Sequence, residues 1–296
     1  MPLLLAAAFV WGAASDAFTH GCEVALVDLY RDDAAPALGR LNAYGAVGDL
    51  LGPLTLAAAA ASGLGWRAAF VLGAGLMLGY AAWIASQPFP RPRPPVARPT
   101  SAVLAVVRDR RILLLAVVDG LFGLLDEPFL GFTVAFLERE RGLPPAAATL
   151  IVSVAVAAGI AGFLSVPLFT ARWPSGRLLP ALAAALGLAI AALITAPVAA
   201  LQVAAAGAFG FSGALFFALL QATYLALRPG QAGTSQAVVS TIGFFGIGFP
   251  ALVGAASDAF GLTTGLGLYA AVPLAMLPLL ALGLRPGAGA PMGRTG

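Results

Sequence analysis

The chain has 296 residues, of which 60% are hydrophobic and 10% charged, and its formal net charge is +3. Soluble domains carry about 25% charged residues, so this composition excludes an ordinary soluble protein and indicates membrane spans. The single cysteine, Cys22, excludes a disulfide framework, and one histidine excludes a histidine-rich metal site. The arginines lie in loops between apolar segments, which indicates topology signals rather than a nucleic-acid surface. We therefore expect no cofactor, no metal and no nucleic-acid partner.

Apolar segments of membrane length recur along the chain. A bilayer core of about 30 Å needs about 20 apolar residues per helix. We therefore predict an all-α polytopic membrane protein with about nine transmembrane helices. The predicted spans cover residues 3–29, 43–62, 67–87, 111–136, 146–170, 178–197, 199–227, 237–257 and 262–284.

The segment from Pro88 to Arg111 separates the first three spans from the rest. It contains six prolines and six of the sixteen arginines, so we predict a semi-rigid, extended linker rather than a packed domain. The predicted domains are residues 1–88, the three-helix remainder of an N-terminal bundle; 89–110, a cytoplasmic linker; 111–284, a six-helix C-terminal bundle; and 285–296, a cytoplasmic tail.

The arginines also predict the orientation in the membrane. Loops this basic stay on the cytoplasmic side. With the linker inside, Arg67, Arg139 and Arg141 fall outside, and the other thirteen of the sixteen arginines fall inside. We therefore expect a multi-pass protein of the cell (plasma or inner) membrane, with its N-terminus outside and its C-terminus in the cytoplasm.

A weak internal repeat relates residues 1–88 to residues 199–286. Each copy holds three predicted spans, and three more spans stand between the copies. Transporters built from two six-helix halves, each made of two triplets, would show this pattern if the first triplet were missing. We therefore expect a truncated or mis-started chain.

Spaced glycines followed by proline occur at corresponding places in the two copies. Small residues at this spacing let helices approach closely in lipid, and proline bends a helix by removing a hydrogen bond. We predict helix-packing or hinge roles for these residues, with ordinary packing glycines as the alternative. They are Gly45, Gly48, Gly52 and Pro53 in the first copy and Gly243, Gly246 and Pro250 in the second.

The stretch GRLNAYGAVGDLLGPLTLAAAAASGLGWRAAF, residues 39–70, resembles the major facilitator superfamily of transporters. Gly48-x-x-x-Gly52-Pro53 is similar to the start of a motif found in exporters of that family, although Leu56 and Ala57 replace its paired glycines. The resemblance implies a partial two-bundle arrangement that comprises helices four to twelve. It also implies that the first, fourth and seventh predicted spans line a central cavity.

Ionisable side chains within lipid are costly and indicate function by default. In the first span Asp16, His20 and Glu23 follow at i, i+4 and i+7 and share a helix face. In the fourth span Asp119 and Asp126 share a face, and Asp126, nearest the centre of the span, is the leading candidate. The full set of predicted substrate or proton-coupling residues is Asp16, His20, Glu23, Asp119, Asp126, Glu127, Gln221 and Tyr224.

These acids, with one histidine and no arginine among them, predict proton exchange and a cationic or neutral amphiphilic substrate. The predicted function is proton-coupled secondary active transport of a small molecule, and export from the cell is one direction that this transport could take.

His20 could instead be a buried histidine paired with a carboxylate, Asp16 an extracellular rim residue and Glu127 a structural acid. A membrane sensor, a structural protein and a non-functional copy are the alternatives. An intramembrane aspartyl protease is disfavoured, because Gly45-x-x-Gly48-Asp49 lacks the required spacing. The oligomeric state is left open.

Overall fold

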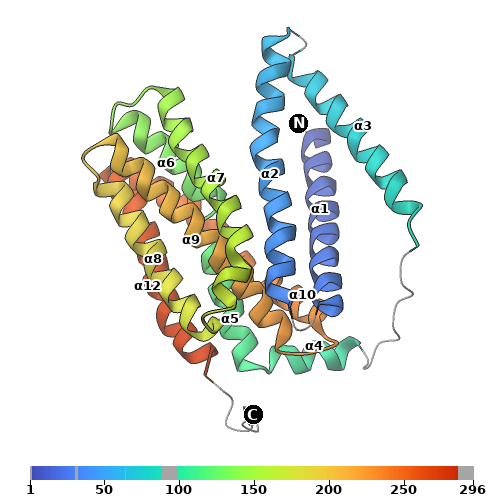
Figure 1. Cartoon of the computed structure of the whole chain (residues 1–296). Coiled ribbons are helices and arrows are strands. Elements are labelled where there is room, and N and C mark those ends of the chain that lie inside the picture. The colour runs from blue at the N-terminus through green and yellow to red at the C-terminus, as the bar shows by residue number, and fades with distance from the viewer. Residues whose placement is uncertain (1, 31–32, 64, 89–98, 286–296) are drawn as a thin grey trace.

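The computed structural model describes all residues except 1, 31–32, 64, 89–98 and 286–296. In this part the chain folds into helices and contains no strand. Figure 1 shows them in chain order. They are α1 (Pro2–Leu29), α2 (Ala34–Ala61), α3 (Gly65–Ala85), α4 (Pro99–Val107), α5 (Arg110–Gly123), α6 (Glu127–Arg139), α7 (Pro145–Thr170), α8 (Ser175–Thr195), α9 (Ala199–Ala226), α10 (Ala232–Gly243), the 3₁₀-helix η1 (Phe244–Gly248), α11 (Phe249–Phe260) and α12 (Leu262–Gly283).

Six helical segments of the described part are long and apolar enough to cross a membrane. They are Arg67–Ala85 within α3, the helices α7, α8, α9 and α12, and the segment Ala232–Phe260 that joins α10, η1 and α11. The other three predicted crossings correspond to α1 and α2, of 28 residues each, and to the pair α5 and α6. The fold is therefore that of an all-α polytopic membrane protein.

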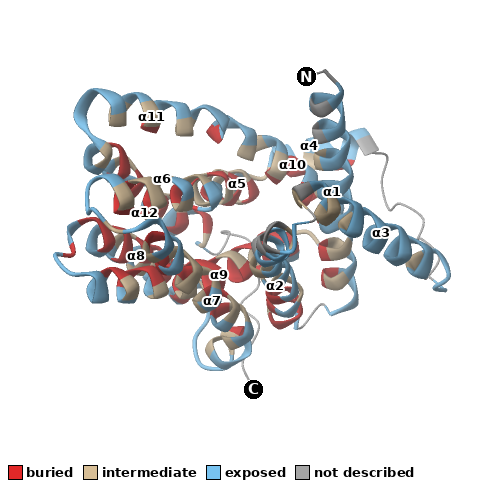
Figure 2. Cartoon of the chain, turned by 90° about the horizontal axis from the view of Figure 1, so that it is seen from above, coloured by how far each residue is buried: buried red, intermediate tan, exposed pale blue. Residues whose placement is uncertain are grey.

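The core of the molecule lies where α9 packs between α7 and α8. Figure 2 shows the buried residues gathered on α5, α8 and α9, whereas α3 and α11 are mostly exposed. Gly210 of α9 packs against the backbone of Ala155, and Gly162 of α7 packs against the backbone of Phe211; a Cβ atom at either glycine would overlap a carbonyl oxygen. Apolar packing gives little preference for a partner in lipid, so such close backbone approach is what holds these helices together.

The first glycine ridge does not pack as predicted. Gly45, Gly48 and Gly52 are exposed, and a Cβ atom added to any of them would meet nothing within 4 Å. Helix α2 instead meets α7 near its start, where a Cβ at Gly39 would lie 2.7 Å from the Phe163 carbonyl oxygen. The rest of α2 diverges from α7 in Figure 1, which leaves the ridge without a neighbouring helix. The side chain of Pro53 lies outside the described part.

Two of the predicted spans are broken helices rather than continuous ones. Span 111–136 divides into α5 and α6 around Asp126, whose backbone has φ −86° and ψ −126°, and a proline stands in the first turn of α6. Span 237–257 starts earlier, at Ala232, and passes through η1 before α11. Proline has no backbone N–H to donate and therefore suits the first turn of a new helix better than a helix interior, and glycines weaken the turns before it.

The prediction of an extended conformation is wrong for residues 99–107, which form α4; residues 89–98 lie outside the described part. Ala102 and Val106, one turn apart, are buried, and α4 lies across the end of α10. The apolar i, i+4 pattern after the last proline explains this helix. Asp109 then caps α5 through the Arg111 N–H, and its other oxygen accepts a 3.1 Å ion-pair contact from Arg228.

Candidate functional site

A polar cavity of about 480 Å³ lies among α1, α5, α9, α10 and η1. Residues from four parts of the chain that are distant in sequence therefore meet in one space. Its lining comprises Asp16, His20, Asp119, Gly120, Gly123, Leu124, Pro128, Phe217, Gln221, Tyr224, Gln236, Ser240, Gly243, Phe244, Gly246, Ile247 and Pro250.

His20 is the centre of a hydrogen-bond network between α1 and α10. Its Nδ1 atom lies 2.8 Å from Glu23 Oε2 and 3.0 Å from Gln236 Nε2, and its Nε2 atom lies 3.3 Å from Ser240 Oγ. The Glu23 side chain is only 3% exposed, whereas that of His20 is 37% exposed. The pair thus joins a buried carboxylate to an imidazole that reaches the cavity.

Nδ1 of an imidazole has one in-plane position for hydrogen bonding. A protonated Nδ1 donates to the Glu23 carboxylate, and it then has no lone pair to accept from Gln236 Nε2. An unprotonated Nδ1 can accept from Gln236. Glu23 and Gln236 therefore compete for one atom, and the proton on His20 decides between them.

The network continues from Gln236 to α9. The Tyr224 hydroxyl donates to Gln236 Oε1 over 3.1 Å. Gln221, one turn earlier, accepts a 3.4 Å hydrogen bond from Asn42 Nδ2 of α2. Tyr224 and Gln221 are each 1% exposed. The polar side chains of α9 are thus held on both sides, by α10 and by α2.

Asp119 of α5 has no hydrogen-bond partner for one of its carboxylate oxygens among the described residues. Its Oδ1 atom is buried and makes no hydrogen bond to any described residue. Because an unpaired buried carboxylate oxygen is costly, the site is suited to a ligand that supplies a donor or a positive charge. Among the described residues, no three His, Cys, Asp or Glu side chains lie together as a metal site would require.

The structure brings some of the predicted residues together and leaves others apart. Asp16, His20, Asp119, Gln221 and Tyr224 line the cavity, and so do Gly243, Gly246 and Pro250. Glu23 is buried behind His20. Asp126 and Glu127 do not belong to the lining, and both are exposed. The break between α5 and α6 is the reason, because it removes Asp126 from the helix face that carries Asp119.

Three polar residues of the network were not predicted from the sequence. Gln236 and Ser240, one turn apart on α10, contact His20, and Asn42 contacts Gln221. Helix α10 begins five residues before the predicted span, and α2 begins nine residues before its predicted span, so Gln236 and Asn42 were assigned to loops. The i, i+4 spacing of Gln236 and Ser240 is the signal that could have revealed them.

The model of the Major Facilitator Superfamily matches residues 1–251. The chain therefore belongs to that family of membrane transporters, whose members act on small molecules. No curated protein matches the chain.

Proposed function

We propose that this chain is a proton-coupled secondary transporter that moves a cationic or neutral amphiphilic molecule through the polar cavity, in the direction of export from the cell. The observation that carries the proposal is the meeting of α1, α5, α9 and α10 around one cavity that contains a His20–Glu23 pair and an unpartnered Asp119 oxygen. Membership of a transporter family supports transport itself. We place the protein in the cell membrane with its N-terminus outside and its C-terminus in the cytoplasm.

The proposed proton site is the His20–Glu23 pair. A buried carboxylate such as that of Glu23 is expensive within a membrane unless it has a function or a partner, and histidine changes charge near neutral pH. Loss of the Nδ1 proton would release His20 from Glu23 and allow Gln236 to donate to it. Gln236 also accepts a hydrogen bond from Tyr224. Protonation of His20 on α1 would therefore change hydrogen bonds made by α10 and α9.

The charge of the cavity supports the proposed substrate class. Its described lining contains Asp16 and Asp119 but no arginine. Phe217 and Phe244 add aromatic surface, which attracts cations as well as apolar groups. We therefore assign substrate binding to Asp119 and proton binding to His20 with Glu23.

The test is uptake of ethidium, a planar organic cation, into proteoliposomes with an imposed pH gradient. We expect gradient-driven movement by the wild-type protein and at least about a tenfold loss in Asp119→Asn, because the loss of a charge-assisted contact costs about 1.5–3 kcal/mol. Asp126→Asn is the matched control and should keep more than about half of the activity.

Two outcomes would contradict the proposal. Equal rates with and without the pH gradient would exclude proton coupling. A wild-type protein that binds ethidium without moving it would favour a membrane sensor.

A further inference from the structure

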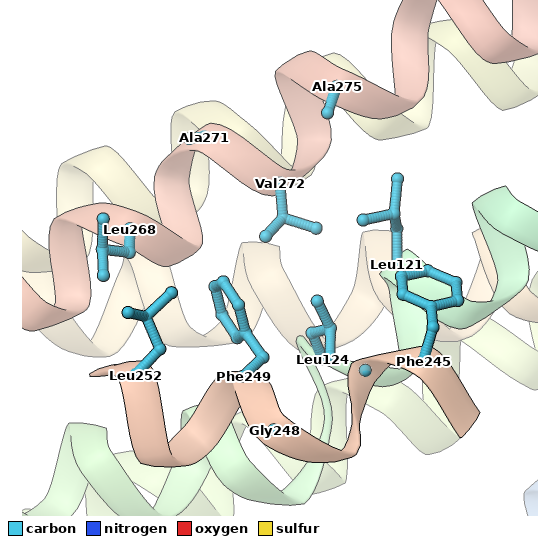
Figure 3. Close-up of a pocket in the computed structure, with 11 residues that line it drawn as sticks. Leu121, Leu124, Phe245, Gly248, Phe249, Leu252, Leu268, Ala271, Val272 and Ala275 are labelled. Carbon is cyan, nitrogen blue, oxygen red and sulfur yellow. The ribbon is translucent and has the colours of Figure 1, made fainter. Parts of the chain in front are cut away.

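A second cavity, an apolar groove of about 460 Å³, lies next to the polar one. Figure 3 shows its side chains converging from three elements: the end of α5, the segment η1–α11, and α12. Each lining residue is aliphatic, aromatic or glycine. They are Leu121, Leu124, Phe245, Gly246, Gly248, Phe249, Leu252, Leu268, Ala271, Val272 and Ala275.

The 3₁₀-helix η1 forms a wall between the two cavities. A 3₁₀-helix has three residues per turn, so residues at i and i+3 share a face. Phe244 and Ile247 line the polar cavity, and Phe245 and Gly248 line the groove. The two sides of one short helix therefore face two different spaces.

Leu124 and Gly246 line both cavities. A Cβ atom on Gly246 would lie 2.5 Å from Leu124 Cδ2, so the leucine packs directly on the glycine backbone. At this point the two residues themselves separate the groove from the polar cavity. A change in the Leu124 rotamer would join the two spaces without any movement of a whole helix.

The groove also opens away from the protein core. Ala271 and Ala275 are exposed, as are Leu252 and Phe245 at 57% and 54%. All four belong to membrane-spanning segments, and no other helix of the described part covers them. The groove therefore extends from this open side of the molecule to Leu124 and Gly246, which separate it from the polar cavity.

We propose that this groove binds the aliphatic tail of an amphiphile whose cationic head lies in the polar cavity. This inference rests on the proposed function and adds a second subsite to it. Asp119 and His20 offer the head a charged environment, and the groove offers the tail an apolar one. The shared boundary at Leu124 and Gly246 distinguishes such a site from a surface furrow that any lipid chain could fill.

The experiment measures binding of two probes, tetramethylammonium and decyltrimethylammonium, to the full chain in lipid nanodiscs. Ala275→Phe places a ring in the groove, and Ala281→Phe is the matched control on an exposed part of α12 that does not line it. We expect Ala275→Phe to weaken decyltrimethylammonium binding by about tenfold, because several methylenes lose their site, each worth about threefold to fourfold in affinity. Tetramethylammonium binding should be unchanged in both variants.

Partition of the probe into lipid is the same for both variants, so a difference between them reports the groove. Ala271→Phe provides a second groove variant in case Ala275→Phe does not fold, as judged by gel filtration. Equal decyltrimethylammonium affinities in the groove variants and the control would overturn the inference and leave the proposed function intact. So would a groove variant that loses only co-purified phospholipid, which would assign the groove to a lipid acyl chain. A wild-type protein that binds neither probe would contradict the cationic substrate itself, and the inference with it.

Discussion

At the scale of single residues, one atom carries most of the proposed coupling. His20 Nδ1 lies within hydrogen-bonding distance of both Glu23 and Gln236, and it can serve only one of them at a time. The same imidazole reaches Ser240 through Nε2, and Gln236 reaches Tyr224. A single proton can therefore rearrange contacts between three helices.

Because the chain has one histidine, ¹⁵N-histidine labelling reports His20 alone. We expect Glu23→Gln to move the Nδ1 resonance, because a charge-assisted hydrogen bond of about 1.5–3 kcal/mol becomes a weaker neutral one. Asp16→Asn on the same helix serves as the control and should leave the resonance nearly unchanged. An unaltered Nδ1 signal in Glu23→Gln would show that the pair does not exist in the membrane.

At the scale of elements, the positions of glycines decide which helices touch. Gly210 and Gly162 let α7 and α9 pack backbone against backbone, whereas Gly45, Gly48 and Gly52 face open space. The two groups look alike in the sequence, and they differ only in what lies opposite them. The two copies of the repeat also differ in helix continuity. Helix α2 runs unbroken from Ala34 to Ala61, whereas the corresponding segment of the second copy is divided into α10, η1 and α11.

We predict that Gly210→Ala destabilises the protein by about 1–3 kcal/mol, because the new methyl group would overlap the Ala155 carbonyl oxygen and separate α7 from α9. Gly48→Ala should be neutral or stabilising by up to about 1 kcal/mol, because alanine favours the helix and meets no neighbour. Unfolding in mixed detergent micelles measures both free energies. A loss of stability in Gly48→Ala of the size expected for Gly210→Ala would show that another surface covers this ridge.

At the scale of the whole molecule, polar contacts join the helix connections at both ends of the bundle. At one end Arg228 binds Asp109, which joins the α9–α10 turn to the start of α5. At the other end Glu140, after α6, accepts hydrogen bonds from the Thr263 hydroxyl and from the Thr263 N–H, the latter over 3.1 Å. The carboxylate therefore lies at the N-terminus of α12, where a negative charge is favoured.

Hydrogen bonding by the Thr263 side chain lowers the pKa of Glu140 below its ordinary value of 4.5. The folded protein thus binds this proton less readily than the unfolded chain, so the contact stabilises above pH 4.5 and is lost as the pH falls through the lowered pKa. Because Glu140 is exposed, we expect a contribution below about 1 kcal/mol.

Glu140→Gln should remove this contribution at neutral pH and flatten the acid limb of a thermal unfolding profile. Glu138→Gln, on the last turn of α6, is the control. Identical acid limbs in Glu140→Gln and the wild-type protein would show that the contact does not stabilise α12.

Much of this architecture follows from local pattern. Apolar length predicts membrane helices, and the i, i+4, i+7 spacing places Asp16, His20 and Glu23 on one face, because helical periodicity depends only on neighbouring residues. Only the tertiary structure decided which acid reaches the cavity. Asp119 and Asp126 are seven residues apart and would share a face on a continuous helix, but the break after Gly123 separates them.

The sequence by itself thus determined a helical membrane protein with polar groups on particular crossings. The meeting of His20 with Gln236 joins residues 216 positions apart, and the groove beside η1 needs three elements at once. Such contacts depend on how helices pack and where they break. Periodicity within one helix carries no information about the helix that lies opposite it, and this is why the site became visible only in three dimensions.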